Sequence, residues 1–559
     1  MMPLPSIKTS PGTPSICCVN ACGLSELDEA GSSCWLGLMA GRTWKRTSRI
    51  VVSFLGVALW LVARQSVSAQ LFTPGDLIVS RSVYEGTAST VTVGQALPGG
   101  GTAVVNGSYP NVWQNEGPDP SFGVTSPIFL DQITPGGSFV NSLALDPSQI
   151  VTSFSSKSEL SLSVSTDGKA ITFMGYAAPV NALDVSNSGT PNHSDPTNPV
   201  GFKTQRAIGQ IDASGQLQVT PVNAYSGNNG RAAILANNVN GSGVNTYYTV
   251  GNAGNGSGTE PVSIVNNTGV QMTTPGVAGE TTVVGKQQGT PGSANGFQFG
   301  YSVTQNGFSA DKSGKDDNFR GMTIFNNTLY VTKGSGNNGI NTVYQVGPAG
   351  ALPTAATAPA TAINVLPGFP TGLAKSAGAQ HPFGLWFANA NTLYVADEGD
   401  GTATDPNAGL QKWTLANNTW TRDYVLQNGL NLGTQYHPSG YTGPAPATGG
   451  LRDLTGRVNQ DGTVTLYATT STISANTDQG ADPNLLLALT DTLAFTVANQ
   501  AASEKFATID SAANGEVLRG VAYLPDSFVP VPEPSTVFSG LGALSLAAGA
   551  FSRGKRRTA

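Results

Sequence analysis

The feature that most constrains the fold is a loose repeat that occurs five times in the chain. Each copy opens with a glycine and a short apolar run, and several continue through a turn into a second run ending in Leu-Tyr-Val or a close variant. The copies begin at Gly230, Gly321, Gly384, Gly450 and Gly520, and the last three intervals are 63, 66 and 70 residues. A repeat made of strands and turns is typical of a β-propeller, in which each repeat contributes to one radial sheet.

Individual turns support the same interpretation. Apolar and polar residues alternate on both sides of Asp167-Gly168 and again after Asp461-Gly462. Asp-Gly favours the tight turn of a β-hairpin because both central positions need a positive φ. No stretch keeps a helical period over three turns, so there is no room for the helices that parallel strands require. The sequence therefore predicts an all-β fold with antiparallel strands.

The number of blades follows from the length of the repeat region. Residues 70–531 number 462, and a spacing near 66 predicts seven blades, with six as the alternative count. We place the propeller domain at residues 70–528. A β-sandwich or a pair of β domains is the alternative architecture, because short strands with alternating patterns fit those folds as well.

Segment 391–415 carries a more specific signal, with Leu-Tyr-Val-Ala-Asp followed by a turn and Leu-Gln-Lys-Trp. This pattern resembles a blade of the NHL type, although residues 401–408 form an insertion in the turn. Other copies keep Leu-Tyr-Val or Leu-Tyr-Ala but lose the aspartate. The resemblance implies a propeller and does not imply a particular activity.

The N-terminal 69 residues have the pattern of an export signal. A basic group precedes the apolar stretch 50–63, and small residues follow up to Ala69. The basic residues are Arg42, Lys45, Arg46 and Arg49. An apolar stretch of this length suits a signal peptide better than a membrane span, which is the alternative. We expect a signal peptide at about 39–69, cleaved by signal peptidase between Ala69 and Gln70, with residues 1–38 arising from an early start codon.

The cysteines belong to this leader. Cys17, Cys18, Cys22 and Cys34 all precede the expected cleavage site, and no histidine lies near them. Their spacing therefore gives little support for a metal site. We expect an exported mature chain without disulfide bonds.

The C-terminal segment 529–559 has a different ordered pattern. Pro532, Glu533 and Pro534 precede the apolar stretch 537–551, and a basic cluster follows at the extreme end. This order resembles the PEP-CTERM sorting signal of Gram-negative bacteria. The resemblance implies a transmembrane helix in the inner membrane, processing by an exosortase-type enzyme and a link to exopolysaccharide production. An ordinary tail anchor is the alternative.

Charge excludes one class of partner. Residues 70–531 contain 30 Asp and Glu against 18 Lys and Arg, so this region carries a formal charge of about −12. Nucleic-acid binding proteins usually need a basic surface, which this region does not provide. An acidic surface favours cations, sugars or solvent as neighbours. Polysaccharide or another surface protein is therefore the expected type of partner.

The best candidate for a metal site is the acidic turn with Asp397, Glu398, Asp400 and Asp405, of which we choose the three aspartates as the metal ligands. Closely spaced oxygen ligands suit Ca²⁺, which tolerates irregular geometry. The alternative is a solvated turn whose aspartates cap their own backbone. A second acidic cluster contains Asp311, Asp316 and Asp317, but two lysines lie within it. Three histidines are well separated in loops, and we expect them to be exposed; these are His193, His381 and His437.

Aromatic side chains are the candidates for sugar stacking. We predict that Trp113, in a polar loop, is the best of them, while Trp386 and Trp413 alternate with apolar residues and belong to the core. The other candidates are Tyr301, Trp420 and Tyr436.

The sequence as a whole favours an exported propeller of the cell envelope or extracellular matrix that acts as a binding or structural module. The alternative function is a propeller hydrolase or lyase acting on sugars or lactones, with bound Ca²⁺.

Overall fold

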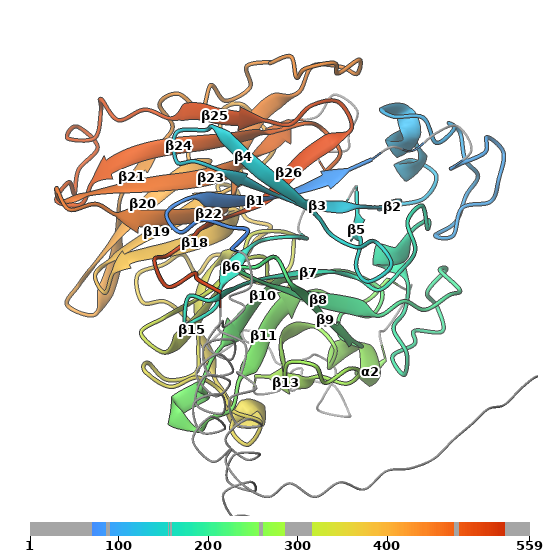
Figure 1. The fold of residues 1–559 in the computed structure, drawn as a ribbon, viewed down its shortest axis with the longest axis horizontal. Helices are drawn as coiled ribbons and strands as arrows, with labels where there is room; N and C mark the ends of the chain where they lie inside the picture. The colour runs from blue at the N-terminus through green and yellow to red at the C-terminus, as the bar shows by residue number, and fades with distance from the viewer. Residues whose placement is uncertain are drawn as a thin grey trace, which may run out of the picture. The chain divides into compact units, whose positions relative to one another are not determined.

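The computed structural model describes residues 70–530 except 85, 87–89, 155, 157–158, 256–260, 286–315 and 474–479. Six antiparallel four-stranded sheets form this region. The innermost strands of successive sheets contact one another in chain order, and the last of them contacts the first, so the sheets close into a ring (Figure 1). The prediction of an all-β propeller is confirmed.

One blade joins the two ends of the propeller. Its strands, from the channel outward, are β26 (Glu516–Tyr523), β1 (Leu77–Val83), β3 (Ile128–Ile133) and β4 (Phe139–Ala144). The last strand of the chain is therefore the innermost strand of a sheet that continues with the first. Closure of the ring depends on the pairing of β26 with β1, and we call the sheet that contains it the closing blade.

The other five blades each use four strands in chain order from the channel outward. Blade 2 contains β6 (Ser163–Val164), β7 (Ala170–Tyr176), β8 (Arg206–Asp212) and β9 (Leu217–Val222). Blade 3 contains β10 (Gly230–Ala236), β11 (Thr246–Gly251), β12 (Gly269–Thr273) and β13 (Thr282–Val284). Blade 4 contains β14 (Met322–Phe325), β15 (Thr328–Lys333), β16 (Thr342–Val346) and β17 (Ile363–Val365).

The last two blades have longer strands. Blade 5 contains β18 (Pro382–Asn389), β19 (Thr392–Asp397), β20 (Gly409–Ala416) and β21 (Thr419–Leu426). Blade 6 contains β22 (Ala447–Val458), β23 (Thr463–Ile473), β24 (Leu485–Thr492) and β25 (Ala507–Ser511). The connecting loops carry the short helices η1 (Asn111–Glu116), η2 (Val185–Asn187), η3 (Val239–Gly241), α2 (Val262–Val265) and η4 (Ala358–Ala360). None of the helices in the described part of the chain has the length and apolar character that a membrane crossing needs.

The glycine of the sequence repeat has a clear structural role. It lies at or next to an innermost strand, and at Gly321, Gly384, Gly450 and Gly520 the backbone of a neighbouring blade passes very close. A Cβ atom at Gly384 would lie 2.6 Å from the carbonyl oxygen of Arg452, and one at Gly520 would lie closer still to the carbonyl oxygen of Leu160. Side chains cannot fit there, so the repeat glycines set the spacing of the innermost strands around the channel.

An insertion between β1 and β3 accounts for part of the difference between six blades and the favoured seven. Residues 84–127 leave the closing blade and form η1 together with β2 (Thr125–Ser126), which pairs with β5 (Thr152–Ser153). This two-stranded sheet is not a blade. Together with the long loops, the insertion takes up length that an even division assigned to another repeat, so the alternative count of six holds.

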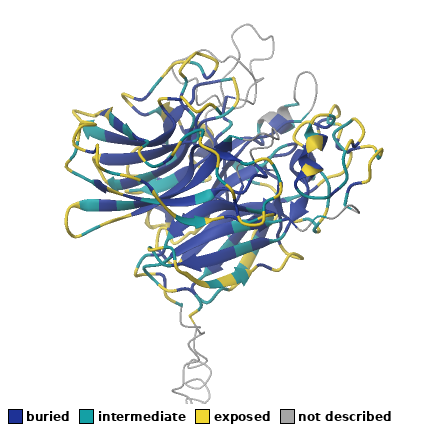
Figure 2. Ribbon diagram, turned by 90° about the horizontal axis from the view of Figure 1, so that it is seen from above, coloured by how far each residue is buried: buried dark blue, intermediate teal, exposed yellow. Residues whose placement is uncertain are grey.

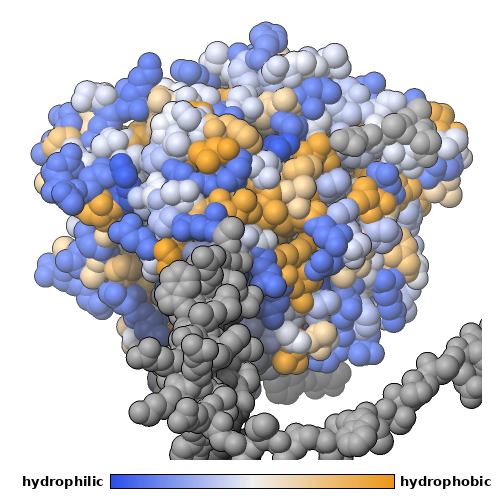
Figure 3. Space-filling model, in the orientation of Figure 1, coloured by the Kyte–Doolittle hydropathy of each residue, from blue (hydrophilic) through white to orange (hydrophobic). Residues whose placement is uncertain are grey.

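Apolar packing lies mainly between neighbouring sheets. Figure 2 shows buried residues along the strands and exposed residues at the loops around the rim. In one cluster, Val343 of blade 4 packs with Leu385, Phe387 and Trp413 of blade 5. On the face drawn in Figure 3, apolar side chains lie in small groups among polar ones. The interior between the blades therefore supplies most of the apolar burial that stabilises the ring.

Candidate functional site

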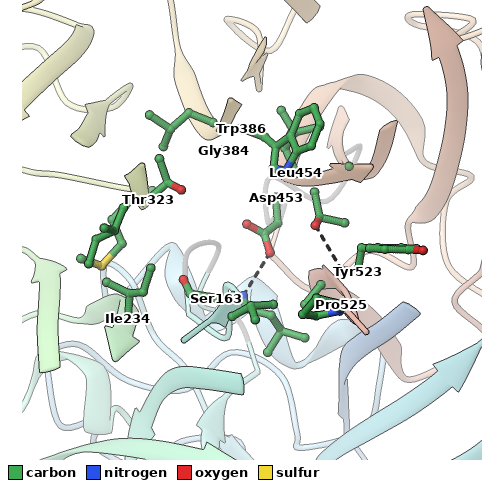
Figure 4. Close-up of a pocket in the computed structure, with 18 residues that line it drawn as sticks. Ser163, Ile234, Thr323, Gly384, Trp386, Asp453, Leu454, Tyr523 and Pro525 are labelled. Atoms are coloured by element: carbon green, nitrogen blue, oxygen red, sulfur yellow. Dashed lines mark hydrogen bonds between the residues drawn. The ribbon is translucent and has the colours of Figure 1, made fainter. Parts of the chain in front are cut away.

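The central channel has two ends of different chemistry. We call the end where the innermost strands begin the proximal end, and the end where they finish the distal end. At the distal end a cavity of about 280 Å³ is lined by residues from all six innermost strands (Figure 4). Its lining includes Ile234, Met322, Trp386 and Tyr523, and Asp453 is the one acidic residue among the lining residues.

Asp453 is fully engaged by the protein itself. Its Oδ1 accepts a hydrogen bond from Ser161 Oγ at 2.6 Å, and its Oδ2 accepts from the amide of Val521 at 2.9 Å. Its Oδ2 also accepts from the amide of Leu162 at 3.1 Å (Figure 4). Burial raises the pKa of Asp453 to about 6, although these bonds oppose the rise. The carboxyl group therefore links blade 6 to blade 2 and to the closing blade. Because both of its oxygens are already hydrogen-bonded to the protein, it is not free to act on a ligand in the distal cavity.

The proximal end has a buried cluster of charged side chains. Glu398, just after β19, lies between two guanidinium groups. Its Oε2 is 3.2 Å from Arg452 Nε, and its Oε1 is 3.8 Å from Arg320 Nη2. The exposed fractions of these side chains are 12% for Glu398, 6% for Arg452 and 9% for Arg320. Blades 4, 5 and 6 thus meet around a single carboxylate.

Two further arginines extend this cluster around the ring. Arg231 of β10 donates to Asn318 Oδ1 and to the carbonyl oxygen of Phe319. Arg519 of β26 donates to backbone carbonyl oxygens, among them that of Ser156, whose hydroxyl accepts from Asn229 at 2.7 Å. We call Arg231, Arg320, Arg452 and Arg519 the arginine belt.

The guanidinium groups of the arginine belt are all buried. Burial first, and then the neighbouring guanidinium of Arg320, lower the pKa of Arg231 well below its ordinary value. Burial also lowers the pKa of Arg320, with Arg452 adding to the effect and Glu398 opposing it. Arg452 Nη2 is buried and has no hydrogen-bond partner among the described residues. A buried guanidinium nitrogen without an acceptor is costly, so the position beside Arg452 Nη2 is suited to an anionic group.

A second group of ligating side chains lies beside Glu398. One nitrogen of His381 and one oxygen each of Asp397 and Asp405 lie within 4.8 Å of one another. Burial raises the pKa of Asp397 to about 8. Its Oδ2 accepts from the amide of His381 at 2.8 Å and from Gln411 Nε2 at 3.0 Å. Imidazole with two carboxylates is a ligand set that suits Zn²⁺ or Mn²⁺ better than Ca²⁺, which prefers oxygen ligands alone.

The predicted acidic turn is therefore divided. Asp397 and Asp405 come together, whereas Asp400 is exposed and its Oδ1 accepts from the amide and hydroxyl of Thr402 at 2.8 and 2.6 Å. Asp400 thus acts as a turn-capping residue. Of the other acidic cluster, Asp316 and Asp317 are buried, and Thr268 Oγ1 donates to Asp317 at 3.4 Å.

The three histidines have different surroundings. His193 is partly buried, with Nε2 2.6 Å from Glu280 Oε2 and Nδ1 2.9 Å from the carbonyl oxygen of Ser263. His381 lies in the metal-ligating group, and His437 is exposed. The expectation of exposed loop histidines is thus wrong for His193 and for His381, whose Nδ1 is buried without a hydrogen-bond partner among the described residues.

Trp113, the aromatic residue that we favoured for sugar stacking, is in fact buried. It lies in η1 with 2% exposure and stacks on Phe154 at 5.2 Å between ring centroids. The insertion between β1 and β3 forms an apolar core, and Trp113 packs inside it although the loop sequence around it is polar. Trp413 and Trp420 are also buried, as predicted for Trp413, and Trp413 stacks on Phe369 at 3.8 Å. The indole of Trp386 is partly buried and lines the distal cavity.

The remaining predicted positions are Tyr436, which the structure describes, and six residues that it does not describe. Tyr436 is partly buried, and its hydroxyl donates to the carbonyl oxygen of Pro483 at 2.9 Å. Other positions lie outside the described residues; these are Ala69, Tyr301, Asp311, Pro532, Glu533 and Pro534. Gln70 is the first described residue.

Comparison with known proteins gives only remote likenesses. No protein-family model matches the chain, and no curated protein matches it. The parainfluenza virus 5 hemagglutinin-neuraminidase ectodomain matches at 11% identity and TM-score 0.32, over 77% of this chain and 92% of that one. An acylaminoacyl peptidase matches at 8% identity and TM-score 0.26, over 69% and 41%. A Synechocystis apocarotenoid oxygenase variant matches at 9% identity and TM-score 0.22, over 73% and 57%.

Likenesses of this strength carry no functional argument. The ring of six sheets closed by β26 and β1 defines the class of protein without them: the chain is a six-bladed β-propeller.

Proposed function

We propose that this protein is an exported β-propeller of the cell envelope or extracellular matrix that binds an acidic ligand, such as a carboxylate-bearing polysaccharide, at the proximal end of its channel. The observation that carries the proposal is the arginine belt around Glu398, with the buried and unpartnered Nη2 of Arg452. Guanidinium groups bind carboxylates through paired hydrogen bonds, and a desolvated site strengthens each of them.

Export belongs to the same proposal. The pattern of residues 39–69 supports cleavage by signal peptidase, and the Pro532-Glu533-Pro534 motif with its apolar stretch and basic end supports exosortase-type processing. A transient anchor in the inner membrane would then precede release. Cell fractionation with N- and C-terminal sequencing of the mature chain tests this. Cytoplasmic protein that retains residues 39–69 and 537–559 would contradict it.

Direct binding tests the ligand proposal. Purified protein should bind polyglucuronate and not neutral dextran, and binding should weaken as salt rises, because screening acts on charged partners. Arg452→Gln should weaken binding by about tenfold or more, since a desolvated charge pair contributes at least 1.4 kcal/mol. Arg422→Gln, at an exposed position on β21, is the matched control. Equal binding of dextran, or full binding by Arg452→Gln, would refute the proposal.

A second candidate function is a metal-dependent hydrolase or lyase acting on sugars or lactones. It is supported by the group of His381, Asp397 and Asp405. Asp397 directly precedes Glu398 in the chain, and His381 and Asp405 lie beside Asp397 in space. A bound divalent cation could polarise a substrate oxygen there, with the arginine belt holding an acidic substrate. Release of reducing ends or unsaturated sugars from polyglucuronate on addition of Zn²⁺ or Mn²⁺ would support it, and intact polymer after prolonged incubation would exclude it for this substrate.

A further inference from the structure

A buried lysine and a buried aspartate meet between blades 5 and 6. Lys412 of β20 lies with its Nζ 2.8 Å from Oδ2 of Asp491 on β24, and neither side chain has any exposed surface. Lys412 Nζ also donates to the carbonyl oxygens of Thr492 and Leu493 at 2.8 and 3.2 Å. These contacts hold the amine against one face of the carboxyl group.

The surroundings of this pair contain further hydrogen-bonding groups. The hydroxyl of Tyr394 donates to Oδ2 of Asp491, and the hydroxyl of Tyr424 donates to Oδ1 at 2.6 Å. Burial, together with the neighbouring Asp491 carboxylate, raises the pKa of Glu504 to about 8. A carboxyl group with a raised pKa and two phenols therefore lie beside one amine and one carboxylate. The amine, the carboxylate and both phenols are buried, and Glu504 is partly buried.

We propose that Lys412 and Asp491 condense to form an isopeptide bond that links β20 to β24. A bond forms between Nζ of Lys412 and Cγ of Asp491, and the bond from Cγ to Oδ2 breaks. Oδ2 leaves as water, and its two protons come from the Lys412 ammonium group. The product is a neutral amide, so atoms and charges balance without an oxidant or another reactant.

The site supplies what such a condensation needs. Transfer of a proton from Lys412 Nζ to Asp491 Oδ2 across their 2.8 Å contact would give the uncharged amine and acid, which are the forms that react. The Tyr394 and Tyr424 hydroxyls are placed to stabilise negative charge that develops on the Asp491 oxygens. Glu504, as the protonated acid beside Asp491, would give its proton to the leaving oxygen and take one from the amine in return. Holding the amine at the carboxyl group also removes the entropy cost of bringing them together.

A cross-link here would serve this chain in a particular way. All four cysteines lie before residue 35, so residues 70–530 have none to form disulfides. The bond would join two adjacent blades and would enclose residues 413–490, which contain most of blade 6. Closing a long loop covalently restricts the unfolded chain, as a disulfide does.

Mass spectrometry of the intact purified protein tests the inference. The expected result is a mass lower by one water molecule than the mass calculated from the same N- and C-termini. Digestion should then give a branched peptide that contains Lys412 and Asp491. The peptide with Lys169, an exposed lysine in the β6–β7 turn, is the internal control and should appear unbranched in the same digest. Full mass with separate, unmodified Lys412 and Asp491 peptides would overturn the inference.

Two variants extend the test. Asp491→Ala should restore the full mass, whereas Glu504→Gln should slow bond formation, so that freshly made protein is largely unlinked and gains the bond over time. Both masses are read on denatured protein, so the result does not depend on the variant keeping its fold after purification. A water deficit that persists in Asp491→Ala would place the bond elsewhere and contradict the assignment.

Discussion

Arg81 Nη1 on β1 lies 2.6 Å from Glu516 Oε1 on β26, so an ion pair joins the first strand of the propeller to the last. The same guanidinium contacts Asp131 of β3 through Nε at 2.5 Å. Burial opposes the charge on Arg81, but the hydrogen bond and attraction to Asp131, together with Glu516, raise its pKa. One side chain thus holds three strands of the closing blade together.

Loss of this contact should loosen the closure of the ring. Arg81→Met is expected to lower the free energy of unfolding by about 1–3 kcal/mol, because the buried Asp131 and the partly buried Glu516 lose a charged donor. Urea denaturation measures the change. Lys169→Met, at an exposed position in the β6–β7 turn, should have almost no effect. Equal stability of the two variants would show that strand pairing alone closes the ring.

The repeat glycines give a second prediction. Gly520→Ala places a Cβ against the carbonyl oxygen of Leu160, where neither backbone can move without shifting an innermost strand. We expect a loss of about 1–3 kcal/mol, the usual cost of overpacking, or more if the ring cannot adjust. Gly372→Ala is the control, since nothing lies within 4 Å of a Cβ at Gly372. A melting temperature unchanged from the native protein in Gly520→Ala would contradict the spacing role.

The raised pKa of Asp453 predicts that the free energy of unfolding depends on pH. Its pKa in the folded protein is about 6, above the ordinary value of about 4. Between these values the folded state binds more protons than the unfolded state, so this group lowers stability as pH rises from about 4 to 6. Asp453→Asn cannot ionise and can keep all three hydrogen bonds. Its stability relative to the native protein should therefore rise by roughly 3 kcal/mol between pH 4 and pH 7, since each pKa unit is 1.36 kcal/mol. Denaturation curves at four pH values measure this. A difference in the free energy of unfolding between Asp453→Asn and the native protein that stays constant with pH would contradict the prediction.

The inner half of each blade could be predicted from the sequence, and the outer half could not. The glycine, the apolar run and the Asp-Gly turn at Asp167 or Asp461 mark the two strands nearest the channel, because close approach and tight turns demand particular residues there. Outer strands such as β13 (Thr282–Val284) and β17 (Ile363–Val365) have only three residues each. A pattern so short is indistinguishable from the long loops around it, so the count of blades was not fixed by spacing alone.

The candidate site was only partly predictable for a different reason. Asp397 and Asp405 are close in sequence, so their pairing could be expected from a single turn. The arginine belt is formed by residues hundreds of positions apart, and it meets only because the ring closes. A signal was nevertheless present: Arg231, Arg320 and Arg519 are each adjacent to a repeat glycine, and Arg452 lies two residues after Gly450. Residues close to the repeat glycine lie near the same end of the channel in every blade, which would have placed these side chains at one end.

Divalent cations should distinguish the metal-ligating group from a turn that only caps itself. Zn²⁺ or Mn²⁺ is expected to raise the melting temperature more than Ca²⁺, because an ion that binds only the native state stabilises it, and His381 disfavours Ca²⁺. His381→Ala and Asp405→Asn should each abolish the shift, since either change removes one of the ligands.

Asp400→Asn is the matched control for this prediction. The exposed carboxylate of Asp400 is bonded to Thr402 rather than directed at His381, so the variant should keep the full response to Zn²⁺. If Asp400→Asn abolishes the shift and His381→Ala leaves it, the ligands are those of an all-oxygen Ca²⁺ site in the turn. If no ion changes the melting temperature of the native protein, Asp397 and Asp405 act as backbone caps, because both already accept amide hydrogen bonds from the turn.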